Sequence, residues 1–256
     1  MIPRVSICIP AYKAERFLQE TLESVRSQTF TEWELIVTED GSRDQTEAIV
    51  NEFARTVTQP VRYSRHDPNR GLPATRNAGI AQVRTEWIAL LDADDLWERE
   101  HLQDLWNCAQ KAKADIIHSG SLLFDSATGR QLEIRAPDES QVAALPLSLF
   151  IGNYVIQPSS VLLRRALWQR VQGFDPDFKF VEDREMWLRC LRAGAGIEYN
   201  RKNSCRYRKH PEALSYASTE MALANARVFE KNMTWDAIPL EVRTKLAAQA
   251  WFAYGS

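Results

Sequence analysis

The first half of the chain alternates short apolar segments with longer segments in which apolar residues recur every three or four positions. The apolar segments predict four strands, at Val5–Ile9, Trp33–Thr38, Val61–His66 and Trp87–Leu91. The periodic segments predict helices at Glu15–Gln28, after a cap at Ser42 or Asp44, and at Pro73–Gln82. This alternation is typical of βαβ units, so we expect an α/β fold with a Rossmann-like, mainly parallel sheet flanked by helices.

The second half of the chain is less regular. Its pattern predicts a hairpin at Leu122–Glu133, strands at Ser160–Leu163 and Cys205–Arg208, and helices at Arg165–Val171 and Glu182–Leu191. From Tyr216 onward the pattern is helical, with a break at Ile238 and Pro239. We expect the apolar residues of these last helices, Trp251 and Phe252 among them, to pack on the core. A homodimer contact and a membrane-surface helix are the alternatives.

Composition and charge narrow the class of protein. Of the 256 residues 45% are hydrophobic and 26% are charged, which is a core-forming, globular composition. The 32 basic and 34 acidic residues give a net charge of −2, so no nucleic-acid partner is expected. Four scattered cysteines without a CxxC pair argue against a zinc site of His and Cys and favour a reducing compartment. With no long apolar run and no signal-peptide pattern, we expect a cytoplasmic protein.

Three carboxylates follow the apolar strand that ends at Leu91, namely Asp92, Asp94 and Asp95. Ligands bind at the carboxyl ends of parallel strands, and carboxylates crowded in such a crevice need a cation beside them. Oxygen ligands favour Mg²⁺ or Mn²⁺, which complete their shell with water and substrate phosphates. The alternative is a solvated loop in which Asp95 caps a helix that begins near Glu98. We expect Asp95 to do so, which leaves Asp92 and Asp94 for the metal.

The turn after the first strand, Ile9–Tyr12, contains no glycine. A GxGxxG fingerprint and a GxxxxGK[ST] loop are both absent from the sequence, so a nucleotide's phosphates cannot be held by a glycine-rich backbone in the usual way. Metal and side chains would have to neutralise them instead.

Two further segments carry candidate chemistry. Glu182 and Asp183 open a predicted helix; a carboxylate there is favoured by the helix dipole alone, but it could also accept a proton from a bound hydroxyl. His210 follows Arg206, Arg208 and Lys209, and this basic segment could close over a diphosphate. The alternative for His210 is an ordinary surface histidine.

In this order the segments resemble the inverting glycosyltransferases of family 2, which have the GT-A fold. The resemblance runs from about Val5 to Ser215 and rests on six segments: VSICIPAYKAERFLQETLESVRSQTF, WELIVTEDGSRDQT, NRGLPATRNAGI, WIALLDADD, GFDPDFKFVEDREMWLR and YRKHPEALS. No single segment is specific, but six in the family's order are.

The resemblance implies roles for individual residues. Pro10, Tyr12 and Asp40 would hold the nucleobase, and Arg76 would line the nucleotide side of the pocket. Asp92 would contact the ribose or the metal's water shell, Asp94 would ligate Mn²⁺ or Mg²⁺, and His210 would touch the metal or the diphosphate. Asp183 would be the catalytic base, with Glu182 on the acceptor side. Glu39 would also face the nucleotide, and it departs from the family's more usual Asp by its longer side chain.

The resemblance also implies an activity and an organisation. We expect a GT-A domain at residues 1–215, with a nucleotide-binding half at 1–118 and an acceptor-side half at 119–215, and a helical C-terminal extension at 216–256. The activity would be metal-dependent transfer from a nucleoside-diphosphate sugar, expected to be UDP-linked, to a saccharide or lipid-linked saccharide in bacterial surface polysaccharide or glycoconjugate synthesis. The protein would be cytoplasmic, with peripheral contact at the inner face of the membrane left open.

Three other functions compete with this interpretation. An aspartyl-phosphate phosphatase would need an Asp pair after the first strand, where Cys8, Ile9 and Pro10 stand. A sugar-phosphate nucleotidyltransferase would need a glycine-rich and basic first loop, which is also missing. A sugar-nucleotide-binding or scaffold protein without turnover remains as the non-enzymatic alternative, although Asp94 and Asp183 are both present.

Overall fold

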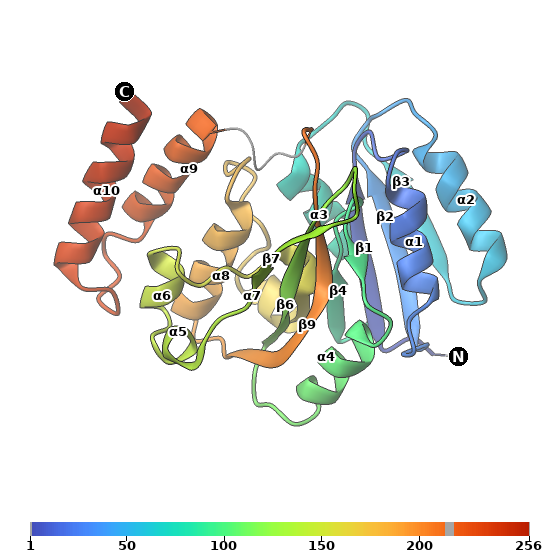
Figure 1. Cartoon of the computed structure of the whole chain (residues 1–256), viewed down its shortest axis with the longest axis horizontal. Helices are drawn as coiled ribbons and strands as arrows, with labels where there is room; N and C mark the ends of the chain where they lie inside the picture. The colour runs from blue at the N-terminus through green and yellow to red at the C-terminus, as the bar shows by residue number, and fades with distance from the viewer. Residues whose placement is uncertain (1, 213–217, 256) are drawn as a thin grey trace.

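The computed structural model describes residues 2–212 and 218–255. Within these ranges nine strands form one sheet, in the order β3-β2-β1-β4-β8-β6-β9-β5, with β7 paired to β6 (Figure 1). The helices α1 and α2 lie at one side of the molecule in this view, and the C-terminal helices α9 and α10 lie at the other.

The amino-terminal part of the sheet is parallel, as predicted. Its strands are β1 (Val5–Ala11), β2 (Trp33–Glu39), β3 (Val61–Arg65) and β4 (Trp87–Leu90), and β1 pairs in parallel with both β2 and β4. The helices between them are α1 (Leu18–Arg26), α2 (Thr46–Thr56) and α3 (Leu72–Ile80). Before α2, the carboxylate of Asp44 accepts a hydrogen bond from the Thr46 N–H at 3.1 Å, close to the cap that the sequence predicts.

The second part of the sheet joins the first through antiparallel pairing. Its strands are β5 (Leu96–Trp97), β6 (Ile116–Asp125), β7 (Gln131–Arg135), β8 (Val161–Arg164) and β9 (Ile197–Lys209). β8 is antiparallel to β4 and β6, whereas β6 and β9 are parallel. The hairpin β6–β7 is confirmed, with Gly129 at φ +69° in its turn. The final strand is longer than the predicted Cys205–Arg208, because polar residues at 200–203 interrupt its apolar pattern.

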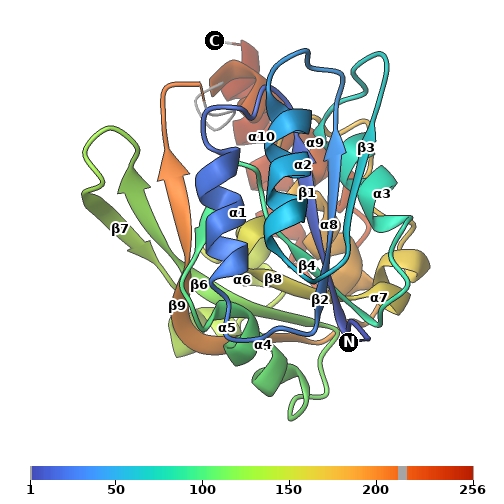
Figure 2. The same cartoon turned by 90° about the vertical axis from the view of Figure 1, so that its right-hand side faces the viewer.

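Alternating side chains divide the core into one layer on each face of the sheet. On β1, Ile7 and Ile9 pack with α1, α2 and α4 (His101–Ala109), while Cys8 packs in the layer on the opposite face. That second layer contains residues of α3, α7 (Arg165–Arg170) and α8 (Glu182–Arg192). Figure 2 shows α1 and α2 side by side on the face turned to the viewer. The sheet is therefore covered on both faces.

Short elements fill the segment between β7 and β8. They are α5 (Glu139–Ala143), α6 (Leu147–Phe150) and the 3-10 turn η1 (Pro158–Ser160). Leu149 and Phe150 of α6 are buried in the same core layer as Met186 and Trp187 of α8. This segment therefore packs beside the helix that carries Glu182 and Asp183.

The C-terminal helices are α9 (Ser218–Lys231) and α10 (Leu240–Gly255), so the predicted break at Ile238 and Pro239 is confirmed. Val228 and Phe229 of α9 are buried in the core layer of α8, and α10 packs against α9. The prediction that Trp251 and Phe252 pack on the core is wrong: their exposed fractions are 39% and 80%. They lie near the end of α10, where Trp251 Nε1 donates to Glu230 Oε1 of α9 at 2.7 Å. Among the described residues, no helix combines the length and apolar character needed to cross a bilayer.

Candidate active site

The parallel strands β1, β2 and β4 deliver the predicted residues to one edge of the sheet. In the β1–β2 register Ala11 lies opposite Glu39, and in the β1–β4 register Cys8 lies opposite Leu90. The residues that follow these strand ends, Tyr12, Asp40 and Asp92, therefore emerge at the same carboxyl edge, where ligands bind in sheets of this kind.

Asp40 is buried and organises the loop that leads into α3. Its carboxylate accepts hydrogen bonds from the N–H groups of Arg70 at 2.9 Å and Gly71 at 2.7 Å, and its Oδ1 lies 2.8 Å from His66 Nδ1. Burial acts to raise the pKa of Asp40, but these hydrogen bonds outweigh it and the pKa is lowered. The carboxylate is thus held ionised, and it fixes the loop beside which the resemblance places a nucleobase.

The other residues expected around the base differ in exposure. Tyr12 is 51% exposed, with Lys13 Nζ 5.3 Å from its ring centre, and Pro10 is buried in β1. Glu39 is 2% exposed and accepts hydrogen bonds from Ser42 Oγ at 2.5 Å and Tyr63 Oη at 2.6 Å. Both carboxylate oxygens of Glu39 are therefore engaged within the protein, whereas the Tyr12 ring is open to a ligand.

Arg76 connects the two halves of the site. This residue of α3 is 2% exposed; its Nη2 donates to Asp92 Oδ1 at 2.6 Å and its Nη1 donates to Glu182 Oε1. Its guanidinium also lies 5.4 Å from the ring centre of Phe174. The Nε atom is buried and has no hydrogen-bond partner among the described residues. One buried cation thus bridges the acidic turn after β4 and the acidic start of α8.

The turn after β4 is held by Ser159 and Arg208. Ser159 Oγ accepts from the Asp92 N–H at 3.0 Å and donates to Asp95 Oδ2 at 2.6 Å. The prediction that Asp95 caps the following helix is wrong, because α4 begins only at His101, with Glu100 before it. Asp95 is instead 1% exposed and also accepts from the Arg208 N–H at 2.9 Å. Burial, followed by the charges of Asp94 and Asp92, raises its pKa.

Asp94 and His210 come together from segments 116 residues apart. His210 Nε2 lies 2.9 Å from Asp94 Oδ2, and the imidazole is 8% exposed, so the surface-histidine alternative is wrong. Its Nδ1 is buried and without a partner among the described residues. Among the residues that the structure describes, no group of three or more His, Cys, Asp or Glu side chains could hold a metal ion without other ligands. A carboxylate and an imidazole still fit Mn²⁺ or Mg²⁺ if substrate oxygens complete the shell.

Glu182 and Asp183 occupy the first turn of α8. Val181, directly before them, has φ +52°, an uncommon conformation for a β-branched residue and one typical of functional sites. Burial raises the pKa of Glu182 to about 7 against the opposing charge of Arg76. Burial also raises the pKa of Asp183, although the Arg184 N–H donates to its Oδ1 at 2.7 Å. A partly buried carboxylate with a raised pKa is suited to accept a proton.

Arg184 ties the start of α8 to two other segments. Its Nε and Nη2 donate to the carbonyl oxygens of Leu149, at 3.2 Å, and Phe150, which end the short helix α6. Its Nη1 donates to Asn225 Oδ1 of α9 at 2.6 Å. The residue next to the predicted base thus joins the segment before β8 to the C-terminal helices.

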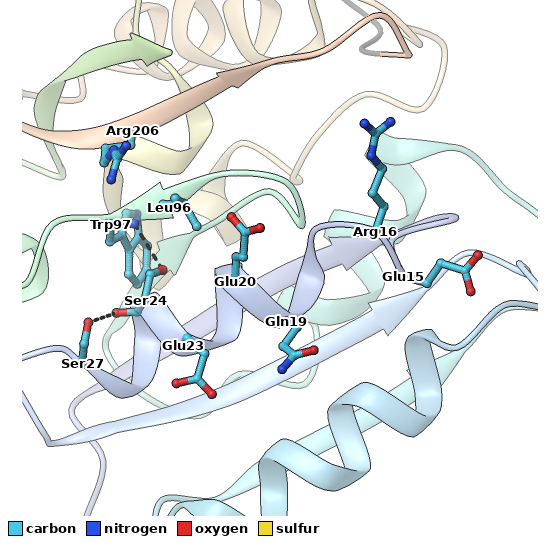
Figure 3. Close-up of a pocket in the computed structure, with 10 residues that line it drawn as sticks. All are labelled: Glu15, Arg16, Gln19, Glu20, Glu23, Ser24, Ser27, Leu96, Trp97 and Arg206. Carbon is cyan, nitrogen blue, oxygen red and sulfur yellow. Dashed lines mark hydrogen bonds between the residues drawn. The ribbon is translucent and has the colours of Figure 1, made fainter. Parts of the chain in front are cut away.

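The sequence interpretation expects the basic segment at 206–210 to close over a diphosphate with its charges side by side. The structure does not present these charges together. Arg206 Nε lies 3.8 Å from Glu98 and its side chain lines a groove with α1 residues such as Glu20 and Glu23 (Figure 3). Arg208 is 4% exposed and points inward, where its Nε donates to the Asp94 carbonyl oxygen at 2.6 Å. Arg206 and Arg208 are two residues apart on β9 and both lie beside the Phe124 ring, but only Arg208 is buried.

Sequence reasoning missed two residues that hold the site together. Ser159 stands in a run without a recognisable motif, and its role depends on β8 lying beside β4. In the sequence, Arg208 could be recognised only as one of several basic residues in its segment. The contact between η1 and the turn after β4 arises from the order of strands in the sheet. The local sequence therefore gives no sign of it.

Comparisons with known proteins agree with this geometry. A family model described as glycosyl transferase family 2 matches residues 6–170. A curated relative from Bacillus subtilis (strain 168), described as uncharacterized glycosyltransferase EpsJ, is 28% identical over 223 residues, which make up 84% of this chain and 64% of EpsJ. The chain therefore spans less than two thirds of that relative.

Solved structures share the fold at low identity. S. aureus TarS 1-349 in complex with UDP-GlcNAc has a TM-score of 0.75 and 20% identity, covering 98% of this chain and 72% of that one. The mannosyltransferase PcManGT from Pyrobaculum calidifontis, in complex with GDP-Man and Mn²⁺, has a TM-score of 0.74 and 17% identity, covering 100% and 73%. These likenesses confirm the expected GT-A fold. Because the family model covers more than half of the chain, this protein belongs to glycosyl transferase family 2.

Proposed function

We propose that the protein is an inverting glycosyltransferase that moves a sugar from a nucleoside-diphosphate sugar to an acceptor hydroxyl. The observation that carries this proposal is the Arg76 bridge between Asp92 and Glu182. It sets the acidic turn, suited to a metal–diphosphate group, beside the start of α8, where Asp183 is suited to deprotonate an acceptor. A site that combines both features fits a transfer reaction better than it fits simple binding.

The reaction is a single displacement at the anomeric carbon. Asp183 takes the proton of the acceptor hydroxyl as that oxygen forms its bond to the anomeric carbon, and the bond from this carbon to the diphosphate oxygen breaks. The electron pair of the broken bond leaves with the nucleoside diphosphate. Attack on the face opposite the leaving group inverts the configuration. Glu182, held by Arg76, lies on the acceptor side of Asp183 and fixes the first turn of α8.

The donor side uses the residues at the strand ends. Tyr12 would pack on the nucleobase beside the loop that Asp40 holds, with Pro10 and Glu39 forming the wall behind it. Mn²⁺ or Mg²⁺, held by Asp94 and His210 with nucleotide oxygens, would offset charge on the departing diphosphate. The neighbours TarS and PcManGT are described with UDP-GlcNAc and GDP-Man, which supports a nucleotide-sugar donor. We take a UDP-linked donor as the first candidate.

The proposal also covers the acceptor and the place in the cell where the protein would meet it. We expect the half at 119–215 and the extension at 216–256 to receive a saccharide or a lipid-linked saccharide during surface polysaccharide or glycoconjugate synthesis. A cytoplasmic protein, with contact at the inner face of the membrane, would meet such an acceptor. The exposed Phe252 at α10 supports a surface contact of this end of the molecule.

The proposal is tested with the purified chain, Mn²⁺ and a panel of UDP-, GDP- and dTDP-linked sugars. Calorimetry measures binding, and release of nucleoside diphosphate measures slow donor hydrolysis; EDTA provides the metal-free control. We expect at least one donor to bind and to be hydrolysed with Mn²⁺ only. Binding without any turnover, in the presence of a broad acceptor mixture, would instead support the sugar-nucleotide-binding alternative.

A further inference from the structure

The turn formed by Asp92–Asp95 is shaped through its backbone as well as through its carboxylates. Arg208 Nε donates to the Asp94 carbonyl oxygen at 2.6 Å, and the Arg208 N–H donates to Asp95 Oδ1 at 2.9 Å. Thr21 Oγ1 of α1 lies 3.0 Å from the Ala93 carbonyl oxygen and 2.9 Å from that of Asp95. The Asp94 carbonyl oxygen therefore has a partner on β9, and the Thr21 hydroxyl of α1 lies within hydrogen-bond distance of the carbonyl oxygens of Ala93 and Asp95.

The Arg208 side chain is itself fixed on every side. Its guanidinium lies 4.5 Å from the ring centre of Phe17 and 4.9 Å from that of Phe124. Its Nη2 donates to Glu20 Oε2 at 2.8 Å, and the side chain is only 4% exposed. The planar guanidinium can stack on aromatic rings while its edge donates in two directions, which a lysine cannot do. Arg208 thus links the turn to α1.

The same contacts reach the second candidate metal ligand. The Phe17 ring, which stacks near Arg208, lies 4.9 Å from the imidazole of His210. Arg208 and His210 are two residues apart, so extended backbone directs them to the same side. Asp94 is held through its carbonyl oxygen by Arg208, and its carboxylate faces His210 at 2.9 Å. The position of Arg208 therefore affects the positions of both Asp94 and His210.

We propose that Arg208 is a positioning residue that sets Asp94 and His210 for the metal-dependent part of nucleoside-diphosphate binding, through its link from the acidic turn to Glu20 of α1. The inference rests on the proposed function, and it concerns only the gain in affinity that the metal brings. Arg206 provides a matched control. It stands on the same strand and lies 4.7 Å from the same Phe124 ring, but it faces Glu98 and the groove of Figure 3.

The test measures the affinities of UDP and GDP by calorimetry, each with Mn²⁺ and with EDTA. The ratio of the two affinities is the metal-dependent gain. For Arg208→Met we expect this gain to fall about tenfold or more, while the affinity in EDTA stays within about twofold of the wild type. Arg208→Lys, which reaches one partner at a time, should be intermediate. Glu20→Gln, at a side chain that is 61% exposed, should lower the gain about threefold, and Arg206→Met should not change it.

Each outcome decides between the two proposals. Wild-type gain in both Arg208→Met and Arg208→Lys overturns the inference, and so does an equal loss in Arg206→Met. If Arg208→Met does not fold, Arg208→Lys and Glu20→Gln carry the same comparison, and an unchanged gain in both overturns the inference. A double variant that combines Glu20→Gln with Arg208→Met should lose no more of the metal-dependent gain than Arg208→Met alone. A wild-type protein that binds neither nucleotide under any condition contradicts the proposed function instead.

Discussion

Arg76 of α3 forms an ion pair with Glu182 of α8, a residue 106 positions further along the chain. The same guanidinium donates to Asp92, so the two acidic segments of the site share one buried cation. The two carboxylates that it bridges would repel each other without it, and burial already raises the pKa of Glu182. The bridge therefore stabilises the fold and brings the acidic turn after β4 together with the start of α8.

Loss of the Arg76 charge should be strongly destabilising. We expect Arg76→Met to lower the free energy of unfolding by about 3–5 kcal/mol, because it leaves Asp92 and Glu182 without their buried partner. Urea unfolding at pH 7 measures the effect. Arg55→Met is the control: that ion pair with Glu52 is exposed, and its loss should cost less than about 1 kcal/mol. Equal losses of unfolding free energy in the two variants would show that the buried bridge contributes no more to stability than the exposed ion pair.

Asp40 should contribute stability in a pH-dependent manner. Its pKa is lowered in the folded state, so its contribution is present above the unfolded pKa of about 3.9 and is lost as the pH falls through the folded value. We expect Asp40→Asn to be about 2 kcal/mol less stable at pH 7, with the difference narrowing only below about pH 4. Urea unfolding at several pH values checks this. A difference that stays constant down to pH 3 would argue against the ionised carboxylate as its cause.

The alternation of apolar and periodic segments was sufficient to predict the parallel strands β1 to β4. Of these, β1, β2 and β4 are buried on both faces, whereas β3 is only partly buried. The same pattern placed Asp40, Asp92 and Asp94 at the carboxyl edge. It did not predict the partners of Asp95 and Glu182, since Arg208 and Arg76 reach them only through the sheet order and the packing of α3 against α8. Local pattern also misjudged Phe252, because an apolar side chain in a helix does not show whether a neighbour covers it.

Arg184 should act on the acceptor side without being required for donor binding. We expect Arg184→Met to increase hydrogen exchange in residues 147–157, because the carbonyl oxygens of Leu149 and Phe150 lose their donor, and to cost about 2 kcal/mol in stability. Arg192→Met, on the same helix with an exposed contact to Thr234, should change neither. Unchanged exchange at 147–157 in Arg184→Met would show that this segment is held by packing alone.

Asp94 should matter for nucleotide binding only when a metal is present. We expect Asp94→Asn to lower the affinity for UDP or GDP with Mn²⁺ by about tenfold or more, and to leave the affinity in EDTA unchanged, because an amide is a weaker metal ligand than a carboxylate. Calorimetric titration measures both. Asp104→Asn on α4 serves as a control of the same chemistry away from the site. A titration with no change in Asp94→Asn would remove this residue from the metal shell.

The most direct test of the account compares the wild type with Asp183→Asn in transfer from a nucleotide sugar that the panel identifies. The carboxylate must be ionised to accept a proton and its pKa is raised, so wild-type transfer should decline as the pH falls toward and below that value, above the ordinary range for Asp. Asp183→Asn should bind the donor and Mn²⁺ as the wild type does, yet transfer about 10²- to 10⁴-fold more slowly at every pH. Asp177→Asn, at an exposed position before α8, should behave as the wild type. Transfer by Asp183→Asn at a near wild-type rate would contradict the central claim that Asp183 is the base of an inverting glycosyltransferase.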